Sequence, residues 1–230
     1  RCFPITSISP SADLSGATLY PYQQDGVSWM NSVVSEGVGC VLADEMGLGK
    51  TFQIIALIAL YKDEGKVVVI APNSLLENWR REFAKFAPGI RVLVHRGNNR
   101  SRRWQVFLDY DVVITSYDTV RNDFALFSQF TWNIMVLDEA QSIKNHGTQR
   151  SRIVRELPKK TGIAVSGTPF ENHLTDILSI FDFCFRGLLG DQVNYFVKTY
   201  PDSYSSAKAI ERIISPLLIR RRVEDVKKDL

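Results

Sequence analysis

Short runs of almost continuous apolar residues recur along the first 170 positions of the chain. Such runs are typical of strands covered on both faces, as in a parallel sheet. Between them, apolar positions recur at the three- and four-residue spacing of helices packed on one side. The predicted strands are CVLA at 40–43, VVVIA at 67–71, RVLVH at 91–95, DVVIT at 111–115, IMVLD at 134–138 and IAVSG at 163–167.

The clearest predicted helix is the stretch SLLENWRREFAKFA, which begins at Ser74. Its apolar positions lie four, four and three residues apart, so they share one face of a helix. Ser74 and Glu77 match the S-x-x-E pattern of a capping box. The apolar positions are Leu75, Trp79, Phe83 and Phe86.

The alternation of strands and helices predicts an α/β fold, a three-layer doubly wound domain with a mostly parallel sheet. In such domains the ligand site lies at the carboxyl ends of the strands. After about residue 170 the strand-like runs stop, LTDILSIFDF has helical spacing, and Pro201 and Pro216 interrupt the remaining segment. We therefore predict a core over 1–170 and a mainly helical extension over 171–230.

Composition adds limits to this picture. With 230 residues, 45% of them hydrophobic, the chain can bury the core of one large domain. The formal charge is only +3, so any nucleic-acid affinity must come from local clustering. Three widely spaced cysteines indicate a reducing, intracellular compartment, and we expect no membrane association. Because the chain begins at Arg1 and not at Met, we interpret it as part of a longer polypeptide.

The segment DEMGLGKT lies between a predicted strand and a predicted helix, the context of a phosphate-binding loop. Gly47 and Gly49 let backbone N–H groups converge on phosphate oxygens, Lys50 can reach the β and γ phosphates, and the Thr51 hydroxyl can bind Mg²⁺. The general pattern has Gly where this chain has Asp44, and an ordinary glycine-rich turn is the alternative. The predicted nucleotide-binding loop comprises Asp44, Met46, Gly47, Leu48, Gly49, Lys50 and Thr51.

Two adjacent carboxylates, Asp138 and Glu139, end the apolar run IMVL. Asp138 can hold Mg²⁺ together with Thr51, and Glu139 can orient or deprotonate the attacking water. Alone, such a pair is usually a solvated turn. Beside a phosphate-binding loop it predicts an ATP hydrolase with Lys50, Asp138 and Glu139 as catalytic residues and with ATP and Mg²⁺ as cofactors.

The order of motifs extends beyond the nucleotide site. The chain resembles the first RecA-like lobe of the Swi/Snf-type ATPases of helicase superfamily two, in which Asp is normal at the position of Asp44. The matching segments cover residues 19 to 226. They are LYPYQQDGVSWM, DEMGLGKT, VVVIAPNSLLENWRREF, VITSYDTVRND, VLDEAQSIKN, AVSGTPFENHL and PLLIRRRVEDV.

The resemblance implies further site residues. Gln23 resembles the glutamine that reads the adenine edge, a task that suits an amide, although a surface glutamine is the alternative. Ser74 is also suited to a capping role. In the family, strand ends and helix starts contact the DNA backbone, which positions a protein without reading sequence. The matching candidates are Ser74, Asn78, Ser116, Tyr117, Lys144, Asn145, Gly167 and Thr168.

The resemblance also implies a function, that of an ATP-driven translocase on double-stranded DNA. It implies a second RecA-like lobe in the same polypeptide and a DNA-bound protein as a candidate object to be moved. The location would be the cytoplasm, on the nucleoid, in a prokaryote, or the nucleus in a eukaryote. The alternatives are a strand-separating DNA or RNA helicase and a non-catalytic nucleotide-sensing module.

Two basic segments have no assigned role in this scheme. HRGNNRSRR, from His95, can supplement a DNA surface or be a solvated loop. For IRRRVEDVKK we favour packing of Arg220 to Arg222 against the expected second lobe over DNA contact. The histidines lack the spacing of metal ligands, so we interpret them as structural or surface residues. They are His95, His146 and His173.

Overall fold

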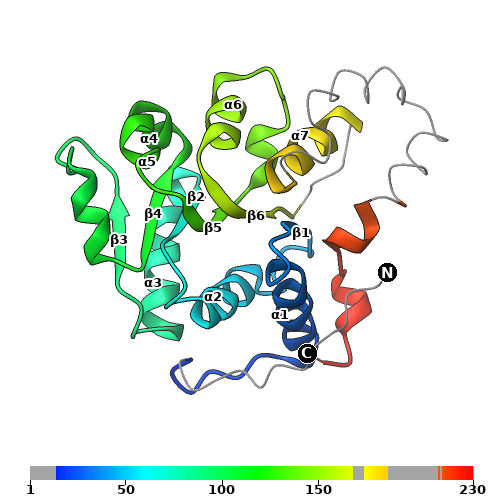
Figure 1. The fold of residues 1–230 in the computed structure, drawn as a ribbon. Coiled ribbons are helices and arrows are strands. Elements are labelled where there is room, and N and C mark those ends of the chain that lie inside the picture. The colour runs from blue at the N-terminus through cyan, green and yellow to red at the C-terminus, as the bar shows by residue number, and fades with distance from the viewer. Residues whose placement is uncertain (1–13, 168–173, 186–211, 213, 230) are drawn as a thin grey trace.

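A parallel sheet forms the middle layer of the protein (Figure 1). The structure is a computed structural model that describes residues 14–167, 174–185, 212 and 214–229. Within these ranges seven strands, all parallel, follow the order β3-β4-β2-β5-β6-β1-β7. They are β1 (Cys40–Leu42), β2 (Val67–Ala71), β3 (Val92–His95), β4 (Val112–Ser116), β5 (Trp132–Leu137), β6 (Lys159–Val165) and β7 (Leu218–Ile219).

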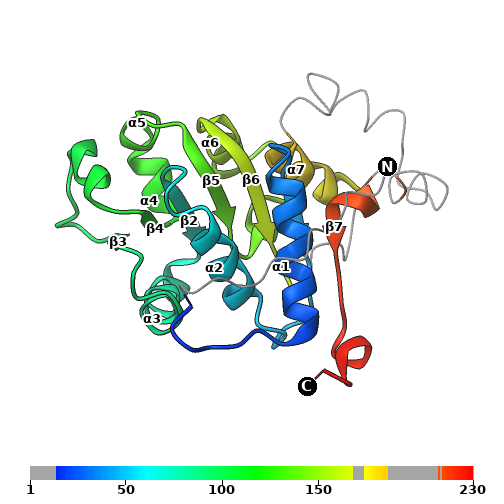
Figure 2. The same cartoon turned by 60° about the horizontal axis from the view of Figure 1, so that its bottom comes forward.

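Helices cover both faces of this sheet, as the two ribbon views show (Figures 1 and 2). One hydrophobic cluster joins the first three helices to one face, and a second joins the remaining helices to the other. This three-layer arrangement confirms the predicted fold class. The α-helices are α1 (Pro21–Val34), α2 (Lys50–Leu60), α3 (Leu76–Phe86), α4 (Tyr117–Asn122), α5 (Phe124–Phe127), α6 (Gln149–Glu156) and α7 (Leu174–Cys184).

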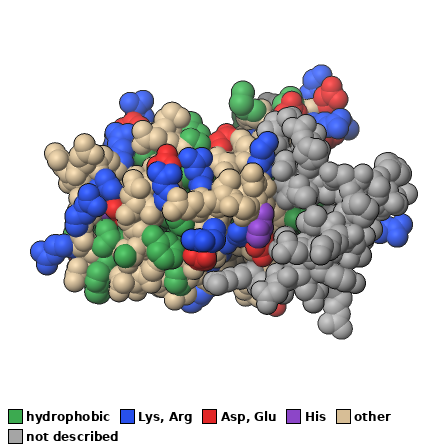
Figure 3. All heavy atoms as spheres, turned by 90° about the horizontal axis from the view of Figure 1, so that it is seen from above, with side chains coloured by type: hydrophobic (Ala, Val, Ile, Leu, Met, Phe, Trp, Pro, Cys, Tyr) green, Lys and Arg blue, Asp and Glu red, His purple; other side chains and the backbone are tan. Residues whose placement is uncertain are grey.

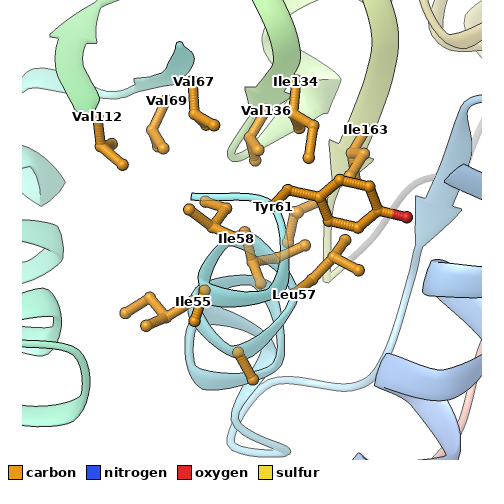
Figure 4. Close-up of a cluster of buried hydrophobic side chains, with 14 of the residues drawn as sticks. Ile55, Leu57, Ile58, Tyr61, Val67, Val69, Val112, Ile134, Val136 and Ile163 are labelled. Carbon is orange, nitrogen blue, oxygen red and sulfur yellow. The ribbon is translucent and has the colours of Figure 1, made fainter. Parts of the chain in front are cut away.

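The helix α2 is the most deeply buried helix on its side of the sheet. Seven consecutive residues from Gln53 to Ala59 are buried, because α2 packs on the sheet with α1 on one side and α3 on the other. Figure 4 shows apolar side chains of α2 in one cluster with those of four strands. This packing fixes the position of α2, whose first residue, Lys50, lies at the carboxyl edge of the sheet. The labelled residues are Ile55, Leu57 and Ile58 of α2, Tyr61 just after it, and Val67, Val69, Val112, Ile134, Val136 and Ile163 of the strands.

All six predicted strands are present, but the expectation that no strand follows residue 170 is wrong. Strand β7 pairs with β1, Leu218 beside Val41 and Ile219 beside Leu42. A strand of two residues is too short to show a recognisable sequence pattern. It forms here because its backbone pairs with β1. The remaining described elements after residue 170 are helical, with η5 at Ser215–Leu217 and η6 at Val223–Val226.

The predicted capping box before α3 is also wrong. The chain enters α3 through a 3-10 turn, η1 (Asn73–Leu75), so Ser74 lies inside that turn and not at the N-cap. Glu77 instead accepts hydrogen bonds from Arg80, one turn further along. The boundary predicted near residue 170 falls among residues 168–173, outside the described ranges, and stays a prediction.

Candidate functional site

Because all strands are parallel, the segments that follow β1, β2, β4, β5, β6 and β7 emerge at one edge of the sheet. The turn after β1 is the predicted phosphate-binding loop, and α2 begins at its end with Lys50. Gly47 and Gly49 adopt φ angles of 93° and 70°, a region that costs other residues strain. The loop can therefore turn its backbone N–H groups towards a ligand at the start of α2.

The side chain of Lys50 folds back over this loop. Its Nζ donates to the backbone oxygen of Asp44 at 2.8 Å and to that of Glu45 at 3.2 Å. Burial lowers the pKa of Lys50, and the nearby carboxylates, Asp138 among them, oppose that shift. Both acceptors are neutral carbonyls, so an anionic phosphate would be a stronger partner for this ammonium.

The carboxylate pair follows β5 and is held from several sides. Trp79 Nε1 in α3 donates to Asp138 Oδ2 at 2.7 Å, and Tyr117 Oη in α4 donates to the Asp138 backbone oxygen at 2.7 Å. Burial raises the pKa of Asp138, which the Trp79 hydrogen bond partly offsets. Glu139 has a φ of 50°, a region uncommon outside glycine, and it accepts a hydrogen bond from Gln141 Nε2. The two carboxylates thus have fixed and separate surroundings.

These groups share one pocket of about 440 Å³. The predicted residues Lys50, Thr51, Asp138 and Glu139 all line it, although the sequence separates the two pairs by almost 90 positions. Asp44 and Leu48, which we predicted in the same site, are buried residues of the loop that do not line the pocket. The pocket is lined by Gln23, Met46, Gly47, Gly49, Lys50, Thr51, Phe52, Leu75, Asn78, Glu82, Phe86, Asp138 and Glu139.

Gln23 lies on the wall of this pocket and is buried, so the alternative of a plain surface glutamine is wrong. Its Nε2 donates to the Leu48 backbone oxygen at 3.2 Å and to Tyr22 Oη at 3.3 Å, and its Oε1 accepts from Tyr20 N. Gln23 therefore supports the phosphate-binding loop directly. To bind an adenine base, the Gln23 side chain would break one of these hydrogen bonds and form a new one to the base.

Asp44 has a partner that the sequence did not predict. This carboxylate is completely buried and forms an ion pair with Arg221, which follows β7. The packing of Arg221 against a second lobe, which we favoured, is therefore wrong, because this side chain lies inside its own lobe. The only signal in the sequence was Asp44 itself, a charged residue where the general loop pattern has glycine.

The two predicted nucleic-acid residues of the segment after β2, Ser74 and Asn78, are exposed. Asn78 also lines the pocket, so this segment reaches from the surface to the nucleotide site. After β4 the picture differs, because Ser116 and Tyr117 are both buried. Ser116 Oγ accepts from Thr119 N as the cap of α4, and Tyr117 bonds Asp138. Their positions favour internal support over a side-chain contact with DNA.

The remaining nucleic-acid candidates come from the segments after β5 and β6. Lys144 and Asn145 are exposed just after η3 (Ala140–Ile143). Gly167 lies beside the nucleotide site, since a Cβ built on it would be 3.7 Å from Lys50 Nζ. Thr168 lies outside the described residues.

The parallel sheet, the phosphate-binding loop and the carboxylate pair together define a nucleotide-binding domain of the P-loop class. The model of the SNF2-related domain family matches residues 22–230, nearly the whole chain. The chain belongs to this family, and it is a Swi/Snf-type ATPase domain. The resemblance seen in the motifs is thereby confirmed.

Relatives come from all three domains of life. The putative ATP-dependent helicase/translocase YwqA of Bacillus subtilis is 40% identical over 96% of this chain and 25% of its own length. The human SWI/SNF-related matrix-associated actin-dependent regulator of chromatin subfamily A member 1 is 34% identical over 97% of this chain and 23% of its own. The SWI2/SNF2 ATPase core of Sulfolobus solfataricus in complex with double-stranded DNA superposes with a TM-score of 0.88. It is 37% identical over 98% of this chain and 49% of that one, so the chain spans about a quarter of the two curated relatives and half of that core.

Proposed function

We propose that the chain is the first lobe of an ATP-dependent translocase on double-stranded DNA, which hydrolyses ATP with Mg²⁺ when joined to a second lobe. The single observation that carries this proposal is the shared pocket of Lys50, Thr51, Asp138 and Glu139. These residues supply a cation, a hydroxyl and two carboxylates in one place, the set that phosphoryl transfer to water requires.

Each residue has a distinct part in this proposal. Lys50 leaves the two loop carbonyls for the β and γ phosphates, while the backbone N–H groups at Gly47 and Gly49 hold phosphate oxygens. Thr51 and Asp138 offer the oxygen ligands that Mg²⁺ prefers, and both line the pocket. When bound, Mg²⁺ would supply charge stabilisation for the transferred phosphoryl group. Glu139 would orient the attacking water or take its proton.

The proposed partner is double-stranded DNA, supported by the complex of the Sulfolobus relative. On the face seen from above the upper helices, basic side chains are scattered among acidic and uncharged ones (Figure 3). Arg150 in α6, for example, pairs with Asp118 in α4. We therefore place DNA at the carboxyl edge of the sheet, through Ser74, Lys144, Asn145 and neighbouring backbone, with Thr168 as a further candidate. A DNA-bound protein is the proposed object to be moved.

No helix in the part of the chain that the structure describes is long and apolar enough to cross a membrane. DNA as the partner implies an intracellular site, on the nucleoid in a prokaryote or in the nucleus of a eukaryote. We propose that a second RecA-like lobe lies elsewhere in the polypeptide. Without it, this 230-residue chain should bind ATP weakly and hydrolyse it slowly, because the proposed second lobe would supply the facing wall of the site.

The test compares steady-state ATP hydrolysis by the full-length protein with duplex DNA, single-stranded DNA and RNA as activators. We expect duplex DNA to stimulate most, and Lys50→Ala and Glu139→Gln each to lower kcat by at least about a hundredfold. Stimulation by single strands with strand separation would instead identify a helicase. Unchanged activity in both variants would identify a non-catalytic module.

A further inference from the structure

Residues 218–226, which we call the C-terminal strap, run beside Asp44 and Glu45, the first two residues of the phosphate-binding loop. The strap starts as β7, and Ala43 N donates to the Ile219 backbone oxygen at 2.8 Å. The pairing continues beyond the sheet, where Glu45 N donates to the Arg221 backbone oxygen at 2.9 Å and Val223 N donates to Glu45 Oε2 at 2.7 Å. Figure 2 shows this orange-to-red segment beside α1.

Arg221 anchors the strap by inserting its guanidinium between the loop and two helices. Its Nε donates to Asp44 Oδ1 at 2.9 Å and its Nη2 also donates to the same carboxylate. Nη2 further reaches Gln53 Oε1 in α2 at 2.7 Å, and Nη1 donates to the Tyr22 backbone oxygen in α1. The guanidinium lies 5.2 Å from the centre of the Tyr22 ring. One side chain thus joins the loop, α1 and α2.

The Arg221 guanidinium is closely packed against α1 and α2. A Cβ added to Gly26 in α1 would lie 2.2 Å from Gln53 Oε1 and 2.7 Å from Arg221 Nη2. Further along the strap, Val226 is buried against Tyr22 and Leu48. The strap is therefore packed into the base of the loop and does not merely lie on the surface.

Two of the residues that hold the strap, Asp44 and Glu45, are also contacted by Lys50. The Lys50 ammonium donates to the backbone oxygens of Asp44 and Glu45, and both of these residues bond the strap. Gln53, one turn after Lys50 in α2, donates to Asp44 Oδ2 at 3.1 Å and to the Leu48 backbone oxygen at 3.3 Å. A movement of Asp44 or Glu45 on nucleotide binding would therefore act directly on the strap.

We propose that the Asp44–Arg221 pair couples the strap to the nucleotide site, so that nucleotide binding and strap docking stabilise each other. Arg221 does not line the pocket, so it is a positioning residue for the loop and not a catalytic one. The identity of the ligand as ATP rests on the proposed function. By linkage, nucleotide binding raises the equilibrium constant for strap docking by some factor, and strap docking raises the affinity for the nucleotide by the same factor.

The test uses this chain and two variants, Arg221→Gln and Arg220→Gln. Arg220 is exposed in the same strap, so its replacement is the matched control. The affinity for a fluorescent ATP analogue should fall about tenfold in Arg221→Gln, within the usual range of coupled sites, and stay unchanged in Arg220→Gln. Saturating ATP should slow hydrogen exchange at the Glu45 and Val223 amides in the unchanged chain but not in Arg221→Gln.

A second measurement needs no nucleotide. In the free chain, Arg221→Gln should speed exchange at the Leu48 and Gln53 amides, which bond Glu45 and Gly49 backbone oxygens, whereas Arg220→Gln should not. If the full-length protein binds no ATP, the proposed function fails, and this exchange result still tests the coupling. If Arg221→Gln does not fold, Glu45→Ala removes the Val223 anchor without leaving a buried charge and should give the same pattern more weakly. Equal ATP affinity and equal exchange in all variants would overturn the proposal.

Discussion

Two glycines in the phosphate-binding loop have the same backbone requirement but different neighbours. Gly47 and Gly49 both have positive φ, so an alanine at either position costs about 1 kcal/mol of strain. Around Gly47 a Cβ would meet nothing within 4 Å, whereas at Gly49 it would lie 2.4 Å from Gln23 Nε2. Only the second substitution must therefore move Gln23.

We predict that Gly49→Ala lowers the free energy of unfolding by about 2–3 kcal/mol and Gly47→Ala by about 1 kcal/mol, because Gln23 also loses hydrogen bonds in the first case. Urea unfolding measures both changes. If Gln23 reads adenine, Gly49→Ala should also reduce the preference for ATP over GTP, and Gly47→Ala should leave that ratio unchanged. An equal loss of preference in both variants would speak against the role of Gln23.

At the scale of elements, α3 connects the surface to the carboxylate pair. Its residue Asn78 is exposed at the pocket, and the next residue, Trp79, is buried with its indole N–H on Asp138. Hydrogen bonds to a charged group contribute about 1.5–3 kcal/mol. Burial raises the pKa of Asp138, and the hydrogen bond from Trp79 partly offsets that rise. If DNA binds as proposed and shifts α3, this hydrogen bond would carry the shift to Asp138, the proposed Mg²⁺ ligand.

We predict that Trp79→Phe in the full-length protein raises the Mg²⁺ concentration needed for half-maximal hydrolysis and moves the acid limb of the pH–rate profile to higher pH. The direction follows because loss of the N–H raises the pKa of Asp138 further, so the carboxylate becomes protonated at a higher pH. The control is Trp132→Phe, since Trp132 is equally buried and its Nε1 donates at 3.0 Å to the Phe127 backbone oxygen. Equal shifts in the two variants would refute the link.

At the scale of the whole molecule, the far edge of the sheet is closed by a buried polar cluster. His95 at the end of β3 bonds Asp123 at 2.9 Å, and Arg100 from the following basic segment bonds the same carboxylate with Nε and Nη2. Arg102 lies 3.4 Å from it. Part of the basic segment is therefore tied to the lobe itself and is not simply a solvated loop.

Burial lowers the pKa of His95, although Asp123 opposes the shift. The unfolded chain takes up this proton near the ordinary value of about 6.5, whereas the folded chain takes it up only at lower pH. The unfolded state thus binds more protons at His95 in that window, so the contribution of His95 to stability falls as pH falls below about 6.5. One group contributes at most about 1.4 kcal/mol per pH unit.

We predict that His95→Gln makes the free energy of unfolding depend less on pH between about 7.5 and 5.5, because glutamine can donate to Asp123 without titrating. Thermal unfolding across this range measures the slope. His146→Gln is the control, since His146 pairs with Asp182 at 3.1 Å elsewhere in the lobe and its loss leaves the His95 contribution in place. An unchanged slope in His95→Gln would contradict the assignment.

By itself, the sequence determined the elements and chemistry that depend on near neighbours in the chain. Apolar runs along the chain located six strands, because strand, turn and helix signals are local. For the same reason, the loop at Asp44 to Thr51 and the pair Asp138 and Glu139 predicted the nucleotide site. Only the tertiary structure decided which distant groups meet. The pairing of β7 with β1, the Asp44–Arg221 pair and the bond from Trp79 to Asp138 join positions far apart in sequence. No periodicity records such contacts, which arise when parallel strands bring their carboxyl ends to one edge.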